Sequence, residues 1–160
     1  MNISNADIRQ LDLILEIYQN ARDFMSKNGN AHQWAGGYPS KELIISDIEQ
    51  GKLYVIECDG KIEGVFYFAS EKDPAYEYIE GSWLNQLPYS VIHRVASAGN
   101  RGGILKAAVN FCLGFCDNIK IDTHENNTVM QGALSKLGFI KCGTIFLENG
   151  EKRIAYQLKK

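Results

Sequence analysis

The sequence predicts one α/β domain over residues 1–160, built on a mixed, mainly antiparallel central sheet with helices on both faces. Two pairs of strand-like runs, one around Asp-Gly and one around Asn-Gly, predict antiparallel hairpins. Between them a strand, a helix and a strand follow in succession, which requires two parallel strands joined by a right-handed crossover. A chain of 160 residues has the length of one domain with a sizeable core.

Two amphipathic helices open the chain. Residues 6–27 carry apolar side chains at helical spacing, and Asn5 is placed to cap them. The stretch NGNAHQWAGGYPS then interrupts the helical pattern with four glycine or proline residues. Ser40 caps a second helix, KELIISDIEQ, which Gly51 ends.

The period changes to that of strands from residue 52. KLYVIEC and KIEGVFYFAS flank Asp59-Gly60, the dipeptide that best fits a type I′ turn. Phe66, Tyr67 and Phe68 are interpreted as strand core rather than as a binding surface. Residues 71–88 have no clear period, and we expect a loop there with one short strand over 76–79.

The second half alternates strands and helices. YSVIHRVA reads as a strand, residues 103–116 as a helix, IKIDTH as a strand and TVMQGALSKL as a helix. FIKCGTIFL and KRIAYQL form the last pair around Asn149-Gly150.

Composition argues against several classes of function. The net charge is −2 and no stripe of Lys and Arg is visible, so nucleic acid is not an expected partner. No apolar run approaches the roughly 18 residues of a membrane helix, and MNISNADIRQ lacks the apolar segment of a signal peptide. We therefore expect a cytoplasmic protein that does not contact membranes.

The four cysteines lack the paired CxxC spacing of zinc sites, and cytoplasmic chains rarely keep disulfides. Cys112 and Cys116 lie four apart on the expected helix, where two thiolates could share a metal. The alternative, that both are small buried hydrophobes, is the one we adopt, so no metal is expected.

A glycine-rich turn stands between the third strand and its helix. Residues 93–105 read HRVASAGNRGGIL, with three glycines within five positions. A helix that begins at glycines exposes unpaired main-chain N–H groups and the positive end of its dipole, and Arg101 adds a cation suited to phosphate. This pattern predicts a phosphate or pyrophosphate site over residues 100–105. Alternatively, the glycines only permit a tight turn. The residues of the turn fit neither the P-loop pattern GxxxxGK[ST] nor the dinucleotide-binding pattern GxGxxG.

The same residues resemble the acetyl-CoA signature of the GNAT superfamily of N-acetyltransferases, whose pattern is Q/R-x-x-G-x-G/A. Val95 precedes Gly103 by eight positions, as in that signature. Downstream, Asn127, Met130 and the ending KLGF resemble the family's next motif. The resemblance spans nearly the whole chain and implies a single GNAT-like domain with acetyl-CoA as co-substrate.

The resemblance also implies which residues hold the cofactor. Pantetheine would run along the main chain of the third strand, pyrophosphate would bind the glycine turn, and one asparagine would contact pantetheine. The residues concerned are Val95, Ala96, Asn100, Arg101, Gly102, Gly103, Ile104, Leu105 and Asn127.

Three positions depart from the family's pattern. Asn100 stands where Gln or Arg is expected, Leu105 where a second Gly or Ala is expected, and Leu134 where many members carry a tyrosine as general acid. Leu105 adds a side chain that could crowd a diphosphate.

Acetyl transfer needs a base, an oxyanion donor and a proton for the leaving thiolate. His93 is the first candidate base, because it precedes Val95 by two and is expected on the same strand face, and imidazole titrates near neutrality. Otherwise His93 is a histidine of the core.

His124, at the end of the next strand, is the second candidate base, or it stabilises its own loop. A main-chain N–H near Val95 would serve the oxyanion. Glu77 and Glu80 are available for a water relay, and Tyr78 or bulk water for the acid.

The acceptor would meet the loop between the first two helices. Trp34 and Tyr38 could wall a small amine-bearing substrate and His32 could add a polar contact, although Trp34 could equally fill the junction of the helices and the sheet.

The sequence therefore predicts an acetyl-CoA-dependent N-acetyltransferase acting on a primary amine of a small molecule or a peptide. The alternative is a catalytically silent acyl-CoA-binding or regulatory module on the same fold. A His93 side chain in the cleft would favour the enzyme. A homodimer is compatible with the resemblance, since dimers are frequent in the family.

Overall fold

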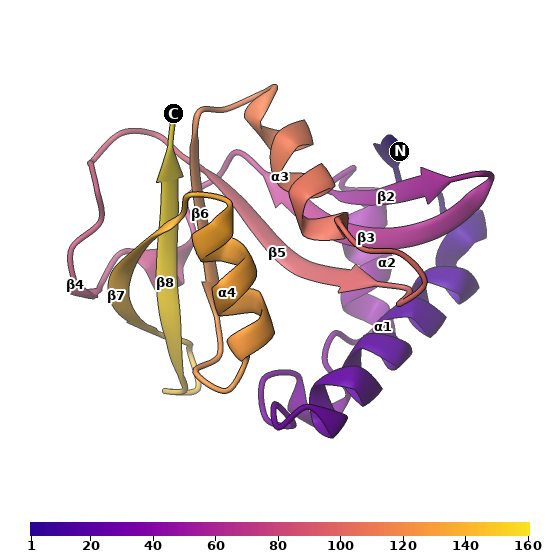
Figure 1. The fold of residues 1–160 in the computed structure, drawn as a ribbon, viewed down its shortest axis with the longest axis horizontal. Coiled ribbons are helices and arrows are strands. Elements are labelled where there is room, and N and C mark those ends of the chain that lie inside the picture. The colour runs from indigo at the N-terminus through magenta and orange to yellow at the C-terminus, as the bar shows by residue number, and fades with distance from the viewer.

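A computed structural model describes all 160 residues and shows one eight-stranded sheet in the order β1-β2-β3-β5-β6-β8-β7-β4 (Figure 1). Only β5 and β6 pair in parallel, so the mixed, mainly antiparallel sheet is confirmed. The strands are β1 Asn2–Asn5, β2 Leu53–Cys58, β3 Lys61–Ala69, β4 Glu80–Gly81, β5 Ser90–Ser97, β6 Asn118–Thr123, β7 Ile140–Phe146 and β8 Lys152–Lys159.

Four α-helices cover the two faces of the sheet (Figure 1). One face packs against α1 and α2 and the other against α3 and α4, each over a hydrophobic cluster of its own. The α-helices are α1 Leu11–Lys27, α2 Lys41–Glu49, α3 Ile104–Leu113 and α4 Thr128–Lys136, and the short 3₁₀ turns are η1 Ile8–Gln10, η2 Ala35–Gly37 and η3 Pro74–Tyr76. No helix combines the length and apolar character needed to cross a bilayer.

Of the two helix caps predicted from the sequence, one is confirmed and one is wrong. Ser40 caps α2 by accepting from the main-chain N–H of Leu43, as predicted. Asn5 does not cap the first helix, because residues 2–5 form an edge strand on β2, and its amide donates to the Gly51 carbonyl. Asp7 caps η1 instead, in a capping box with Gln10. Residues 2–5, with one isoleucine among three polar residues, gave no strand signal.

Both predicted hairpins form. Asp59 and Gly60 have φ of 51° and 75°, which is the double positive φ of a type I′ turn. The strand expected over 76–79 is wrong, because η3 occupies 74–76 and β4 lies further on. Two glycines explain where β4 pairs: a Cβ on Gly143 would lie 2.1 Å from the carbonyl oxygen of Glu80, so β4 and β7 approach only without side chains.

The two core clusters contain the apolar positions expected of them. Phe66, Tyr67 and Phe68 are buried and alternate between the two faces, which confirms that they belong to the core, although Tyr67 also lines the cavity described below. Cys112 is fully buried, and burial raises the pKa of its thiol. Cys116 donates to the Asn118 carbonyl, so both cysteines serve the packing of α3 and its exit.

Strands β5 and β6 pair only at their beginning. The register holds for Ser90 with Ile119 and Val91 with Lys120, and beyond these pairs the strands separate into a wedge. From Ile92 onward, the edge of β5 that faces β6 therefore has no strand partner. This wedge positions the candidate site.

A β-bulge in β5 changes which side chains share a face. Its register against β3 shifts between Val65 and Tyr67, and Arg94 has a φ of 50°. His93 lies beside Tyr67 on the α1/α2 face, whereas Val95 packs with the α3/α4 cluster. The expectation that His93 and Val95 share a face is therefore wrong, because the bulge inserts one residue into the alternation.

Candidate active site

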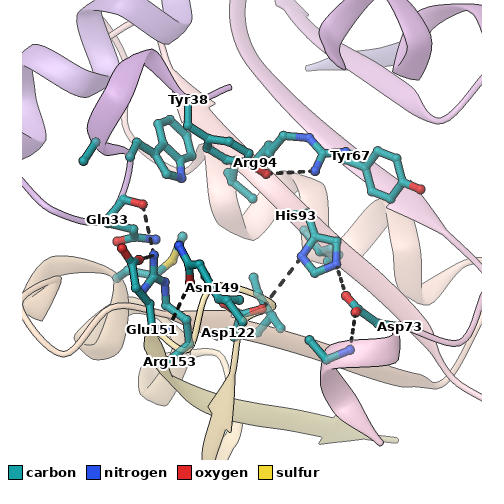
Figure 2. Close-up of a pocket in the computed structure, with 18 of the residues that line it drawn as sticks. Gln33, Tyr38, Tyr67, Asp73, His93, Arg94, Asp122, Asn149, Glu151 and Arg153 are labelled. Carbon is teal, nitrogen blue, oxygen red and sulfur yellow. Dashed lines mark hydrogen bonds and ion pairs between the residues drawn. The ribbon is translucent and has the colours of Figure 1, made fainter. Parts of the chain in front are cut away.

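The principal cavity, about 560 Å³, opens at the wedge between β5 and β6. Most of its wall comes from segments far apart in the sequence: β5, β6, residues 32–38, residues 71–75 and the turn between β7 and β8. Single residues of α1, β3, α4 and β8 complete it. Figure 2 shows their polar side chains converging on the same space. Strands β5 and β6 supply one side of the cavity, and loops that join other elements of the fold supply most of the rest.

His93 lies in this cavity, with its side chain about one-fifth exposed. Its Nε2 lies 2.8 Å from Asp73 Oδ2, and its Nδ1 lies 3.9 Å from Asp122 Oδ2 (Figure 2). The histidine is therefore held between two carboxylates at the cavity wall rather than enclosed in the core.

Asp73 is held in position by hydrogen bonds other than the one to His93. Its Oδ1 accepts from the Ala75 N–H at the start of η3, and its own N–H donates to the Tyr89 hydroxyl. Burial alone would raise the pKa of Asp73, but the hydrogen bond and charge of His93 outweigh it, so the pKa lies below its ordinary value. Asp73 is thus an ionised acceptor at neutral pH.

Asp122 comes from β6, where its side chain is 15% exposed. Its Oδ2 accepts from the Tyr76 hydroxyl at 2.6 Å. Burial of Tyr76, together with the Asp122 charge, raises the pKa of this phenol well above its usual value, so Tyr76 remains a donor.

Sequence reasoning did not single out Asp73 or Asp122 as site residues. It named Glu77, Glu80 and Tyr78 instead, and none of these lines the cavity. Tyr78 lies on the surface against Phe146. Asp73 and Asp122 meet at His93 only through the pairing of β5 with its neighbours, which no local pattern reports.

Arg94 connects the bulge in β5 to α2 and to the loop between α1 and α2. Its Nε and Nη2 bind Asp47 Oδ2 at 2.9 and 2.8 Å, and its Nη1 donates to the Tyr38 hydroxyl at 3.1 Å. Its guanidinium lies 4.4 Å from the centre of the Tyr67 ring. The Tyr18 hydroxyl donates to its carbonyl at 2.9 Å, so side chain and main chain are both held.

The loop between α1 and α2 forms one wall of the cavity. Trp34 and Tyr38 both line it, as does His32. Trp34 is 9% exposed and meets Tyr18 edge to face, so it fills the helix-sheet junction and lines the cavity at once.

Gln33 fastens that loop to the opposite half of the sheet. Its Oε1 accepts from Asn127 Nδ2 at 2.9 Å, and its carbonyl accepts from Arg153 Nη2 at 3.1 Å. Arg153 is buried and also binds Glu151 at 3.1 Å. Gln33, Arg153 and Glu151 were not predicted, since a polar loop residue and a strand arginine carry no distinguishing signal.

His124 lies outside the cavity lining. Its Nδ1 accepts from the Asn126 N–H at 3.0 Å, which closes the turn after β6. Burial, and then the nearby Arg153, lower the pKa of His124. The arrangement matches the loop-stabilising alternative, with a partner that the sequence did not suggest.

The glycine turn leads from β5 into α3 on the α3/α4 side. Gly103 begins the helix with a φ of 84° and offers no side-chain cap, so the first N–H groups of α3 are open to an anion. A Cβ on Gly102 would meet nothing within 4 Å, and one on Gly103 only the Met1 methyl at 4.0 Å. The turn is thus an uncovered main-chain cradle that fits a diphosphate.

The side chains around the turn already have partners. Arg101 pairs with Asp59 of the β2–β3 turn at 2.9 Å, and Asn100 donates to Glu63 Oε2 at 3.3 Å. Leu105 packs against the α3/α4 cluster, and Ile104 is buried there above Gly64, where a Cβ would lie 2.6 Å from it.

The remaining cofactor residues lie at the wedge and beyond it. Val95 lines the cavity, whereas Ala96 is buried on the α1/α2 face, so only its main chain can serve a ligand. Asn127 caps α4 by accepting from the Met130 N–H and donates to Gln33, which occupies both ends of its amide.

Comparisons with known proteins point to one family. The sequence matches no protein-family model and no curated protein. Among solved structures, a GNAT-family acetyltransferase from Streptococcus agalactiae is 32% identical, covers 99% of this chain and 95% of its own length, and has a TM-score of 0.89. GNAT-family acetyltransferases from Listeria monocytogenes and Bacillus cereus cover 99% of this chain, and 94% and 96% of their own, at 19% and 20% identity and TM-scores of 0.72 and 0.66; they share the fold.

Proposed function

Because the chain belongs to the GNAT family of acetyltransferases, we propose that it transfers an acetyl group from acetyl-CoA to a primary amine of a small molecule or a peptide. The observation that carries the proposal is the placement of His93, with its carboxylate Asp73, in the cavity at the wedge beside the unpaired edge of β5. A candidate base and an open strand edge thus meet at the cavity, and β5 continues from there to the glycine turn.

The cofactor would occupy the wedge and the glycine turn. The main chain of Val95 and Ala96 offers an unpaired strand edge to the amides of pantetheine, and the N–H groups from Asn100 to Leu105 offer donors to the pyrophosphate. Acetyl-CoA, when bound, supplies the thioester carbonyl that the amine attacks.

The chain's own groups would carry the proton and the developing charge. His93 accepts a proton from the acceptor, and Asp73 holds its ring and stabilises the imidazolium that results. A main-chain N–H at the bulge of Arg94 and Val95 stabilises the oxyanion. Leu134, at the family's tyrosine position, is fully buried in the core and donates no proton.

The silent-module alternative was motivated by Asn100, Leu105 and the absence of the family's tyrosine, and a His93 enclosed in packed side chains would have favoured it. His93 instead lines the cavity, which favours the enzyme. Leu105 packs against the core, so its side chain is drawn away from the main-chain donors of the turn.

Isothermal titration of the purified protein with acetyl-CoA and with CoA tests the proposal first. We expect micromolar binding, followed by release of free thiol when primary amines are added. A protein that binds acetyl-CoA but releases no thiol with any amine would favour the silent module over the enzyme. No binding up to millimolar acetyl-CoA would contradict the proposal outright.

A further inference from the structure

The contacts of His93 determine which of its ring nitrogens can act. Asp73 is ionised at neutral pH and so can only accept, which places the Nε2 hydrogen in the 2.8 Å bond between them. In neutral His93 the lone pair therefore lies on Nδ1. That nitrogen faces Asp122 Oδ2 at 3.9 Å, so two acceptors point at one another.

No cation of the chain neutralises these two carboxylates. Neither Asp73 nor Asp122 pairs with a lysine or arginine. Three other cations lie near this part of the structure. Arg94 binds Asp47, Arg153 binds Glu151, and Lys120, two residues before Asp122, lies over the Trp83 ring at 4.0 Å. Lys72 also lines the cavity, but it forms no ion pair with either carboxylate. Two partly buried negative charges thus face one histidine, which favours a positively charged ligand.

The spacing suits one nitrogen donor. Acceptors 3.9 Å apart can both lie at ordinary hydrogen-bond distance, about 2.9 Å, from a single nitrogen between them. An alkylammonium carries three donors in a tetrahedral arrangement and can bond both atoms. An alcohol has one donor and no charge, so it satisfies only one of them.

We propose that the acceptor enters as an aliphatic primary ammonium and binds between His93 Nδ1 and the Asp122 carboxylate. Asp122 is then a substrate-binding residue, and Asp73 a positioning residue that sets the tautomer of His93. One proton passes from the ammonium to Nδ1, leaving a neutral amine with a free electron pair and an imidazolium between two carboxylates. The inference rests on the proposed function and narrows its substrate class to amines that are charged in solution, excluding arylamines and alcohols.

The test uses the full chain labelled with ¹⁵N in its histidine rings and observed by NMR at neutral pH. Ethylammonium chloride is the probe, because it is small enough to need only the ammonium site. Ethanol and sodium chloride at the same concentrations are the controls. We expect ethylammonium to shift the His93 Nδ1 resonance saturably and both controls to leave it unchanged. No shift up to 100 mM, or an equal shift with sodium chloride, would overturn the proposal.

Two variants locate the site. Asp122→Asn keeps the shape and an acceptor for Tyr76, and should weaken ethylammonium about ten- to a hundredfold, as loss of a charge-assisted hydrogen bond does. Asp12→Asn, the same change at an exposed position of α1, should leave the affinity unchanged. Equal affinity in Asp122→Asn and the unaltered protein would remove Asp122 from the site. The contrast between ethylammonium and ethanol needs no variant, so the proposal stays testable if Asp122→Asn folds poorly.

The role of Asp73 has its own readout. Asp73→Asn should shift the ring nitrogens of His93 toward a mixture of tautomers without any ligand, whereas Asp122→Asn should not. A His93 tautomer unchanged in Asp73→Asn would contradict the positioning role. Because none of these measurements uses acetyl-CoA, failure of the ammonium site and failure of the proposed function give separate results.

Discussion

His93 and His124 differ in what their ring nitrogens contact. His93 has one nitrogen on Asp73 and the other toward the cavity, whereas His124 uses Nδ1 to close a turn outside it. Both histidines lie in strand-like sequence near polar residues. The sequence therefore distinguished them as candidate bases only by their positions along the strands. The difference arises from which strands flank each one.

Replacing His93 with alanine should lower kcat for acetyl transfer about a hundred- to ten-thousandfold, the usual contribution of a general base. The dissociation constant of acetyl-CoA should change little, since the proposed cofactor contacts are main-chain groups of β5 and the glycine turn, which the substitution leaves in place. Thiol-release kinetics and titration of acetyl-CoA measure the two quantities. His124→Ala serves as the comparison, and an equal loss of kcat in both variants would show that His93 is not the base.

Asp73 links the active site to the stability of the fold. Its pKa in the folded chain lies below the ordinary value of about 3.9, so the unfolded chain binds this proton more readily. The stabilisation is therefore fully present above about pH 5 and is lost as the pH falls through the folded-state pKa.

Asp73→Asn should accordingly reduce the free energy of unfolding by about 1.5–3 kcal/mol at pH 7, the range for a hydrogen bond to a charged group. The difference from the unaltered protein should shrink between pH 5 and pH 3. Urea unfolding across that range measures it, with the exposed Asp12→Asn as control. A difference that stays constant down to pH 3 would mean that the carboxylate charge contributes nothing.

The turn from β5 into α3 combines an open cradle with a left-handed backbone conformation at Gly103. Gly103 needs its positive φ, but Gly102 does not, and a side chain there meets nothing. Gly102 is therefore the position at which the proposed pyrophosphate site can be challenged without disturbing the helix start.

Gly102→Asp should weaken acetyl-CoA at least tenfold, because it places a carboxylate beside the diphosphate. Gly102→Ala adds the Cβ without the charge and should change the affinity only a few-fold. Isothermal titration measures both, and circular dichroism checks that α3 is retained. Unchanged affinity in Gly102→Asp would remove the pyrophosphate from this turn.

Helices and hairpins could be predicted from the sequence because their signals are local. Ser40 predicted the start of a helix and Asp59-Gly60 predicted a hairpin turn, and the structure confirms both. The bulge at Arg94 could not be predicted, because it depends on Asp47 and Tyr18, which lie on α2 and α1. Asp73 and Asp122 likewise meet His93 only through long-range contacts of the fold. The sequence therefore identified His93 as a site residue but not the two carboxylates beside it.

The folded chain has two hydrophobic clusters that share one sheet. Ile14 is fully buried in the cluster under α1 and α2, and Leu134 is fully buried in the one under α4. Since every central strand contributes to both faces, loss of one cluster should expose the sheet on which the other rests.

Ile14→Ala and Leu134→Ala should each lower the free energy of unfolding by about 2–5 kcal/mol while leaving a single transition. Far-ultraviolet circular dichroism and tryptophan fluorescence should give coincident urea curves in both variants. Leu13→Ala, 56% exposed and next to Ile14, should change stability by less than about 1 kcal/mol. Two separate transitions would contradict the prediction of one domain over residues 1–160.

The short parallel pairing of β5 with β6 also divides the sheet. Two residue pairs join the four strands β1, β2, β3 and β5 to the four strands β6, β8, β7 and β4. Main-chain hydrogen bonds between strands thus hold the two halves together at one end only, and at the other end packing and the hydrogen bonds of Gln33 to Asn127 and Arg153 resist their opening. We expect this junction to be the part of the sheet that opens most easily. A ligand that bonds to the free edge of β5 should hold the two halves together and so slow amide hydrogen exchange even in strands that it does not contact.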